Sequence, residues 1–84
     1  MKLVTKYFKP YNPEFQLHKF KTANGSIRYY QIDGWVKNPS KFAVRKSSAD
    51  YWISENIYVT REDLNKSQLK DLELTEKILE GELS

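Results

Sequence analysis

The sequence predicts a small α+β domain: an antiparallel β-sheet of four to six strands, open or curled into a partial barrel, followed by a C-terminal α-helix. Three observations lead to this prediction. The chain has 84 residues, which suits one small domain. Strand-favouring residues alternate with turn signals over residues 1–59. Leucines at helical spacing among charged residues fill 60–81, which leaves 82–84 as a tail.

The first two strands are predicted at residues 2–9 and 14–22. Residues 2–9 are rich in β-branched and aromatic side chains. The segment Pro10-Tyr11-Asn12-Pro13 separates the two strands, because each proline restricts the backbone and lacks an N–H donor. A tight turn is therefore expected at residues 10–13.

Further strands are predicted downstream, each bounded by turn residues. Residues 27–36 form the third strand, with a bulge expected at Gly34, and residues 41–46 form the fourth. Asn38-Pro39-Ser40 lies between them as a turn. After a second turn at residues 47–50, the aromatic and β-branched side chains of 51–53 and 57–59 predict either one interrupted strand or a short hairpin.

Asn24-Gly25 is the strongest local turn signal. Asn-Gly favours a two-residue type I′ loop, in which both residues take positive φ. With that loop Lys21 faces Arg28, Phe20 faces Tyr29 and Lys19 faces Tyr30. The three cations then share one face of the hairpin with Tyr30.

A helix is predicted to begin at Thr60. Thr60-Arg61-Glu62-Asp63 resembles a capping box, and acidic residues suit the positive end of a helix dipole. The leucine stripe is imperfect, which predicts either a continuous helix or one broken near 65–67 or 74–75. Gly81 is a suitable residue to end the helix.

Composition excludes several kinds of chemistry. The chain has no cysteine and one histidine, His18, which excludes disulfides, thiolate zinc sites and multi-histidine metal sites. No apolar run approaches the ~20 residues needed to span a bilayer, and the N-terminal residues do not resemble a signal peptide. We expect a cytoplasmic protein without cofactor, metal or enzymatic activity.

The charge is divided between two halves of the chain. Residues 1–48 hold ten Lys or Arg and two acids, a net of +8, whereas residues 49–84 hold four Lys or Arg and nine acids, a net of −5. The two values give the overall charge of +3. This asymmetry indicates a surface that faces a polyanion and a separate acidic element, or simply two halves that neutralise each other within one fold.

Basic residues interleaved with aromatic residues are typical of single-stranded nucleic-acid binding. Our first hypothesis is therefore a small, non-enzymatic protein that binds RNA or another single strand without base-specific readout. The predicted phosphate contacts are Lys19, Lys21, Arg28, Arg45 and Lys46. The predicted stacking residues are Phe20, Tyr29 and Tyr30.

The alternative is a protein-binding inhibitor or adaptor, antitoxin-like or anti-defence, of the kind that phages and mobile elements encode. The excess of Lys over Arg in this chain and its few alanines are typical of low-GC genomes, such as those of many phages and mobile elements. An acidic helix face, or an exposed sheet face, would then bind the partner. The residues of this acidic row are Glu62, Asp63, Asp71, Glu73, Glu76 and Glu80. Two partly apolar sheet faces beside a single helix also predict a homodimer.

Overall fold

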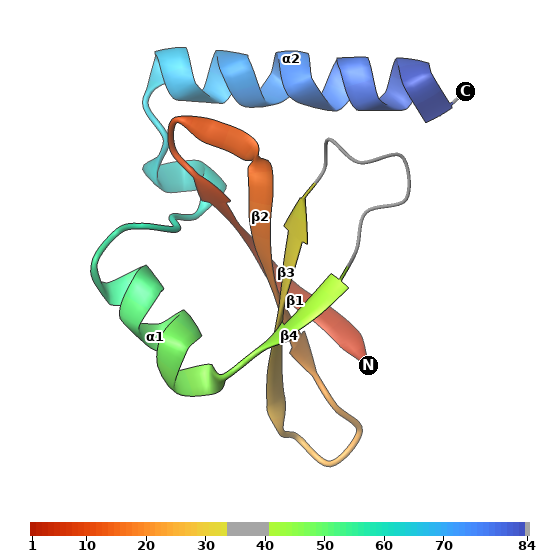
Figure 1. Cartoon of the computed structure of the whole chain (residues 1–84), viewed down its shortest axis with the longest axis vertical. Helices are drawn as coiled ribbons and strands as arrows, with labels where there is room; N and C mark the ends of the chain where they lie inside the picture. Colours follow the sequence, from red (N-terminus) through yellow and green to blue (C-terminus); the bar gives the residue numbers. More distant parts are fainter. Residues whose placement is uncertain (34–40, 84) are drawn as a thin grey trace.

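A computed structural model describes residues 1–33 and 41–83, with the backbone alone at residue 41 and at residues 79–83. Four strands form an open antiparallel sheet in the order β1-β2-β3-β4. Helical elements follow the sheet in the chain (Figure 1). The predicted α+β class is confirmed. The elements are β1 (Lys2–Lys9), β2 (Asn12–Lys21), β3 (Ile27–Asp33), β4 (Lys41–Val44), α1 (Lys46–Ser54), the 3₁₀ turn η1 (Arg61–Asp63) and α2 (Lys66–Leu83).

The turn between β1 and β2 is shorter than predicted. Lys9 pairs with Asn12, so the loop contains only Pro10 and Tyr11, and β2 begins before Pro13. A proline is tolerated there because it stands near the start of the strand and beside a register irregularity. A second irregularity, between Leu3 and Thr5, interrupts the pairing near the N-terminal end of β1.

The register predicted for the second hairpin is wrong by one residue. Thr22 N donates to Ser26 O at 2.8 Å, which leaves a three-residue loop of Ala23, Asn24 and Gly25. Gly25 alone takes positive φ in this loop, at +87°. A three-residue loop needs one left-handed residue where type I′ needs two. Lys21 therefore faces Ile27 rather than Arg28.

The one-residue shift changes which side chains share a face. Phe20 now faces Arg28, His18 faces Tyr30, and Lys19 faces Tyr29. Because strand side chains alternate between faces, Lys19 and Arg28 lie on opposite sides of the sheet. The predicted cluster of three cations on one hairpin face is not formed.

Helix α1 covers one face of the sheet, which we call the α1 face. Its core consists of Leu17, Tyr29, Ala49 and Tyr58, all at most 4% exposed. The prediction of a turn at 47–50 and a strand at 51–53 is wrong, because these residues form α1. Their strand propensity yields to packing: Ala49, Trp52 and Ile53 have helical spacing and all belong to this cluster.

The other face carries a second core at the end of the sheet near the β1–β2 turn. Phe8 packs there with Val59, Leu64 and Leu72. Of the predicted strand at 57–59, the structure shows an isolated antiparallel bridge between Val59 and Phe8. Helix α2 lies across this end of the sheet, far from the β2–β3 hairpin tip (Figure 1). The hairpin half of this face is therefore left outside the second core.

Helix α2 begins at a different cap from the one predicted. Asn65 Oδ1 accepts from Gln68 N at 2.8 Å, and Gln68 Oε1 accepts from Asn65 N at 3.0 Å. This reciprocal pair is a capping box. Thr60 instead precedes η1 and makes no side-chain cap; its hydroxyl donates to the Asp63 carboxylate at 2.9 Å. The predicted range 60–81 is thus divided, with a break near residue 65 and none at 74–75.

The predicted C-terminal stop at Gly81 is also wrong, since α2 runs to Leu83. Glycine weakens a helix without always ending it. The bulge predicted at Gly34 and the turn at 38–40 lie outside the described residues.

Candidate nucleic-acid interface

The side of the sheet opposite α1, in its hairpin half, carries the candidate site, which we call the open face. It consists of Leu3, Lys6, His18, Phe20, Arg28, Tyr30 and Ala43, placed together by the observed register. Arg28, Ala43, Lys6 and Leu3 are exposed, and the rings of His18, Phe20 and Tyr30 are half-buried. Aromatic and basic side chains therefore reach solvent on the same surface.

Three rings form a row on the open face. Phe20 and Tyr30 are diagonal neighbours on β2 and β3, with ring centroids 5.5 Å apart and planes at 79°. His18 lies 6.4 Å from Phe20 on the same strand. Edge-to-face contacts of this kind hold aromatic rings in a defined orientation. The pair is thus a preformed apolar platform on a strand pair.

Two cations flank this platform. Arg28 stands directly across the hairpin from Phe20, and Lys6 stands across from His18. Within the part of the chain that the structure describes, ion pairs join Lys46 to Asp50 and Arg61 to Glu76. Neither Arg28 nor Lys6 is paired with a described carboxylate, so their charge remains available to an anion.

Lys19 and Lys21 lie on the α1 face and not beside the aromatic platform. Lys21 is exposed near the hairpin tip, and Lys19 is half-buried opposite Tyr29. The predicted set of phosphate contacts is therefore split between the two sides of the sheet. The predicted grouping of Lys19, Lys21 and Arg28 fails because the hairpin loop has three residues instead of two.

Tyr29 is a core residue, and its ring is not available for stacking. It is 4% exposed, and its hydroxyl donates to Asp50 Oδ1 at 3.3 Å. Burial, assisted by the nearby Asp50 charge, raises the pKa of Tyr29 to about 12. Asp50 Oδ2 also lies 3.3 Å from Lys46 Nζ. Asp50 therefore joins Tyr29 to the N-terminal turn of α1.

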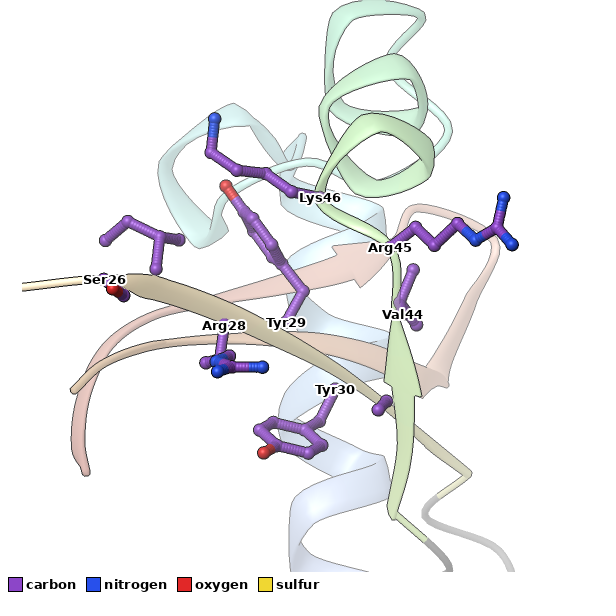
Figure 2. A pocket seen from close by; sticks show the side chains of 9 residues that line it. Ser26, Arg28, Tyr29, Tyr30, Val44, Arg45 and Lys46 are labelled. Carbon is purple, nitrogen blue, oxygen red and sulfur yellow. The ribbon is translucent and has the colours of Figure 1, made fainter.

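A pocket of about 300 Å³ opens at the edge of the sheet, beside the open face (Figure 2). It is formed by the start of β3, the end of β4 and the first residue of α1. Figure 2 shows Arg28 and Tyr30 on one side of the β3 ribbon and Tyr29 and Lys46 on the other. The residues that line the pocket are Ser26, Ile27, Arg28, Tyr29, Tyr30, Ala43, Val44, Arg45 and Lys46. Five of the eight residues predicted for nucleic-acid binding are among them, whereas Lys19, Phe20 and Lys21 are not.

The acidic residues of the alternative hypothesis do not form one row. Asp71 and Glu73 are exposed on α2 but lie two positions apart, which places them on different sides of a helix. Glu76 pairs with Arg61, and Asp63 accepts from Thr60. Glu62 is exposed on η1, and the side chain of Glu80 lies outside the described residues.

The sequence prediction missed four residues of this candidate site. Leu3, Lys6 and His18 join it through the pairing of β1 with β2, and Ala43 joins it through the pairing of β3 with β4. These pairings are long-range, so no local motif marks them. The length of the hairpin loop was the one local signal for this grouping. A loop of three residues places Arg28 across from Phe20.

Neither a metal centre nor a membrane span is found in the described part of the chain. The described residues contain no group of three His, Cys, Asp or Glu side chains that could hold a metal ion. None of their helices is long and apolar enough to cross a membrane.

Comparison with known proteins returned no relative. No protein-family model, curated protein or solved structure matches this chain. The interpretation of the open face therefore rests on its own geometry and charge.

Proposed function

We propose that the protein binds single-stranded nucleic acid, preferably RNA, through the open face, and that it does so without catalysing a reaction. The observation that carries this proposal is the Phe20–Tyr30 ring pair with Arg28 beside it, a cation that has no carboxylate partner among the described residues. Bases stack on such rings at about 1–3 kcal/mol each, and cations hold the phosphates. These three side chains lie on the face of the sheet that is opposite α1.

Binding through this surface should tolerate many sequences. The platform offers ring faces and guanidinium or ammonium groups, which contact every nucleotide in the same way. Readout of a particular base would need several polar groups aimed at base edges. The affinity should fall with salt, because Arg28 and Lys6 displace counterions from the phosphates.

The experiment compares two charge deletions on opposite sides of one hairpin. Arg28→Ala and Lys21→Ala each remove one exposed cation near the hairpin tip. Affinity for a labelled single-stranded RNA pool is measured by fluorescence anisotropy from about 50 to 200 mM salt. Arg28→Ala should weaken binding more than Lys21→Ala at each salt concentration. Equal losses would indicate a non-specific charge effect, and the absence of binding by the wild type at low salt would refute the proposal.

The second candidate function is an inhibitor or adaptor that binds a protein through α2. Leu74 and Ile78 support it, since they lie one helical turn apart and are 57% and 40% exposed. The same pair could be covered by a second copy of the chain. Light scattering at micromolar concentration tests the homodimer. The wild type should then have twice the monomer mass of 10.0 kDa, and the Leu74→Lys variant should have the monomer mass. A monomeric wild type would contradict the homodimer. A pull-down from nuclease-treated lysate would then test whether the chain binds another protein.

A further inference from the structure

The two rings of the aromatic platform do not suit a continuous stack of bases. The planes of Phe20 and Tyr30 meet at 79°, with centroids 5.5 Å apart. A base that stacks on an aromatic ring lies roughly parallel to it. Two bases, one on each ring, would therefore be steeply inclined to each other. Neighbouring bases in that arrangement make no stacking contact between themselves.

The inclination of the rings is held by their surroundings. Both side chains are half-buried. The Tyr30 hydroxyl donates to Met1 Sδ at 3.8 Å. The His18 ring contacts Phe20 at 6.4 Å and 51°, and His18 Nε2 lies 2.8 Å from Gln16 Oε1. Neither of the ring pairs described on the open face is parallel, so a bound strand has to adapt to the rings.

This adaptation costs different strands different amounts. In a free single strand neighbouring bases stack on one another, and bases that are splayed apart lose that contact. Two splayed neighbours give up as many as three base–base stacks, one between them and one on each outer side, and gain two contacts with rings. Adenines stack on one another more strongly than uracils, because a purine has the larger ring surface. The net cost is therefore higher for adenine.

Arg28 lies where the strand has to bend. It stands across from Phe20, and it is two positions from Tyr30 on the same face of β3. Figure 2 shows Arg28 and Tyr30 on the same side of the β3 ribbon. Arg28 is thus a neighbour of both rings, and a guanidinium group there suits the phosphate that links the two splayed nucleotides. Because this contact is to the backbone, it supports every sequence alike.

We infer that the open face binds two consecutive nucleotides with their bases splayed, one on Phe20 and one on Tyr30, and that it therefore prefers weakly stacked, pyrimidine-rich strands to adenine-rich ones. The inference rests on the proposed function, since it names the class of strand that the same interface takes. The preference comes from the stacking of the strand itself and not from contacts to base edges. It is therefore compatible with an interface that accepts many sequences.

The first test compares oligouridylate with oligoadenylate of equal length, by fluorescence anisotropy at about 50 mM salt. The wild type should bind the uridine strand at least about fivefold more tightly. The ratio should fall on warming, because heat opens the adenine stacks and the uridine strand has little stacking to lose. Circular dichroism defines the temperatures at which the protein stays folded. Equal affinities, tighter binding of the adenine strand, or a ratio that does not change with temperature would overturn the inference.

The second test assigns the preference to the two rings. Tyr30→Ala removes one ring, so the strand no longer has to splay and the ratio of affinities should approach one. Tyr30→Leu keeps an apolar side chain and takes its place if the alanine variant does not fold. Tyr51→Ala is the control, because it removes an exposed tyrosine from α1, and it should keep the wild-type ratio. Arg28→Ala should weaken both strands by the same factor. An unchanged ratio in the folded Tyr30 variant would show that the platform is not the source of the preference.

The outcomes separate the two proposals. If the wild type binds both homopolymers equally and Arg28→Ala weakens both, the splayed arrangement is refuted and the interface on the open face stands. If the wild type binds neither strand at about 50 mM salt, both proposals fail together.

Discussion

The two faces of the sheet carry similar residues but present them differently. Tyr29 and Tyr30 are consecutive in β3, yet Tyr29 is sealed beneath α1 at 4% exposed while Tyr30 reaches solvent on the open face. Lys19 and Phe20, which are consecutive on β2, also lie on opposite faces of the sheet. Strand side chains alternate between faces, so composition alone does not say which aromatic residue is core and which is surface. The covered face should respond to substitution through stability and the open face through binding.

The largest effect is expected in the core of the α1 face. Leu17 is 0% exposed, and Leu17→Ala should lower the free energy of unfolding by about 2–5 kcal/mol, through lost burial and the cavity left behind. Leu3 on the open face is 40% exposed, so Leu3→Ala should cost less than about 1 kcal/mol. Urea unfolding followed by tryptophan fluorescence measures both. Similar costs for the two variants would contradict the assignment of the faces.

The next effect is a loss of stability at alkaline pH. Burial raises the pKa of Tyr29 to about 12 and also raises that of Tyr58. An unfolded tyrosine titrates near 10, so the unfolded chain releases the proton first. The stabilisation is fully present below pH 10 and is lost as the pH rises toward 12. The Tyr29 share is about 2–3 kcal/mol.

The alkaline transition is followed by phenolate absorbance and by denaturation between pH 9 and 12. Tyr29→Phe keeps the ring but removes the titrating hydroxyl, and should therefore flatten the fall in stability over this range. An unchanged pH profile in that variant would show that Tyr29 is not the group involved.

A smaller effect, on binding rather than folding, is expected at the open face. Tyr30→Ala should weaken binding of a single-stranded RNA by about 1–3 kcal/mol, the contribution of one stacked base. Tyr51→Ala is the matched control, because Tyr51 is 59% exposed on α1, away from the open face. Equal loss in both variants, measured by fluorescence anisotropy, would rule out stacking on the platform.

The smallest effect separates the two candidate helix caps. Asn65→Ala removes the reciprocal bonds with Gln68 and should lower stability by about 1 kcal/mol. Thr60→Ala removes only an exposed hydroxyl contact to Asp63, so it should cost less. Thermal unfolding of the two variants decides between them. A larger cost for Thr60→Ala would restore the cap that the sequence favoured.

Local signals predicted much of the sheet and several of the residues that line the pocket. The bounds of β1 agree with the prediction at both ends, because Pro10 and the β-favouring residues before it act locally. The Asn24-Gly25 turn lies where it was expected. Arg28, Tyr30, Arg45 and Lys46, which are predicted to contact nucleic acid, all line the pocket. Their grouping was not predicted correctly, because it depends on the hairpin register.

The sequence by itself determined the α+β class, the position of the second hairpin and the presence of a leucine-spaced helix, since each depends on neighbouring residues. Only the tertiary structure decided the register of β2 against β3 and the helical state of residues 51–53. A loop of two or three residues is compatible with Asn-Gly. With the three-residue loop, Leu17 and Tyr29 lie on the α1 face. There they pack with Ala49, Trp52 and Ile53 of α1 in one cluster. Burial of that shared apolar surface outweighs local propensity, and it leaves Phe20, Arg28 and Tyr30 on the opposite, open face.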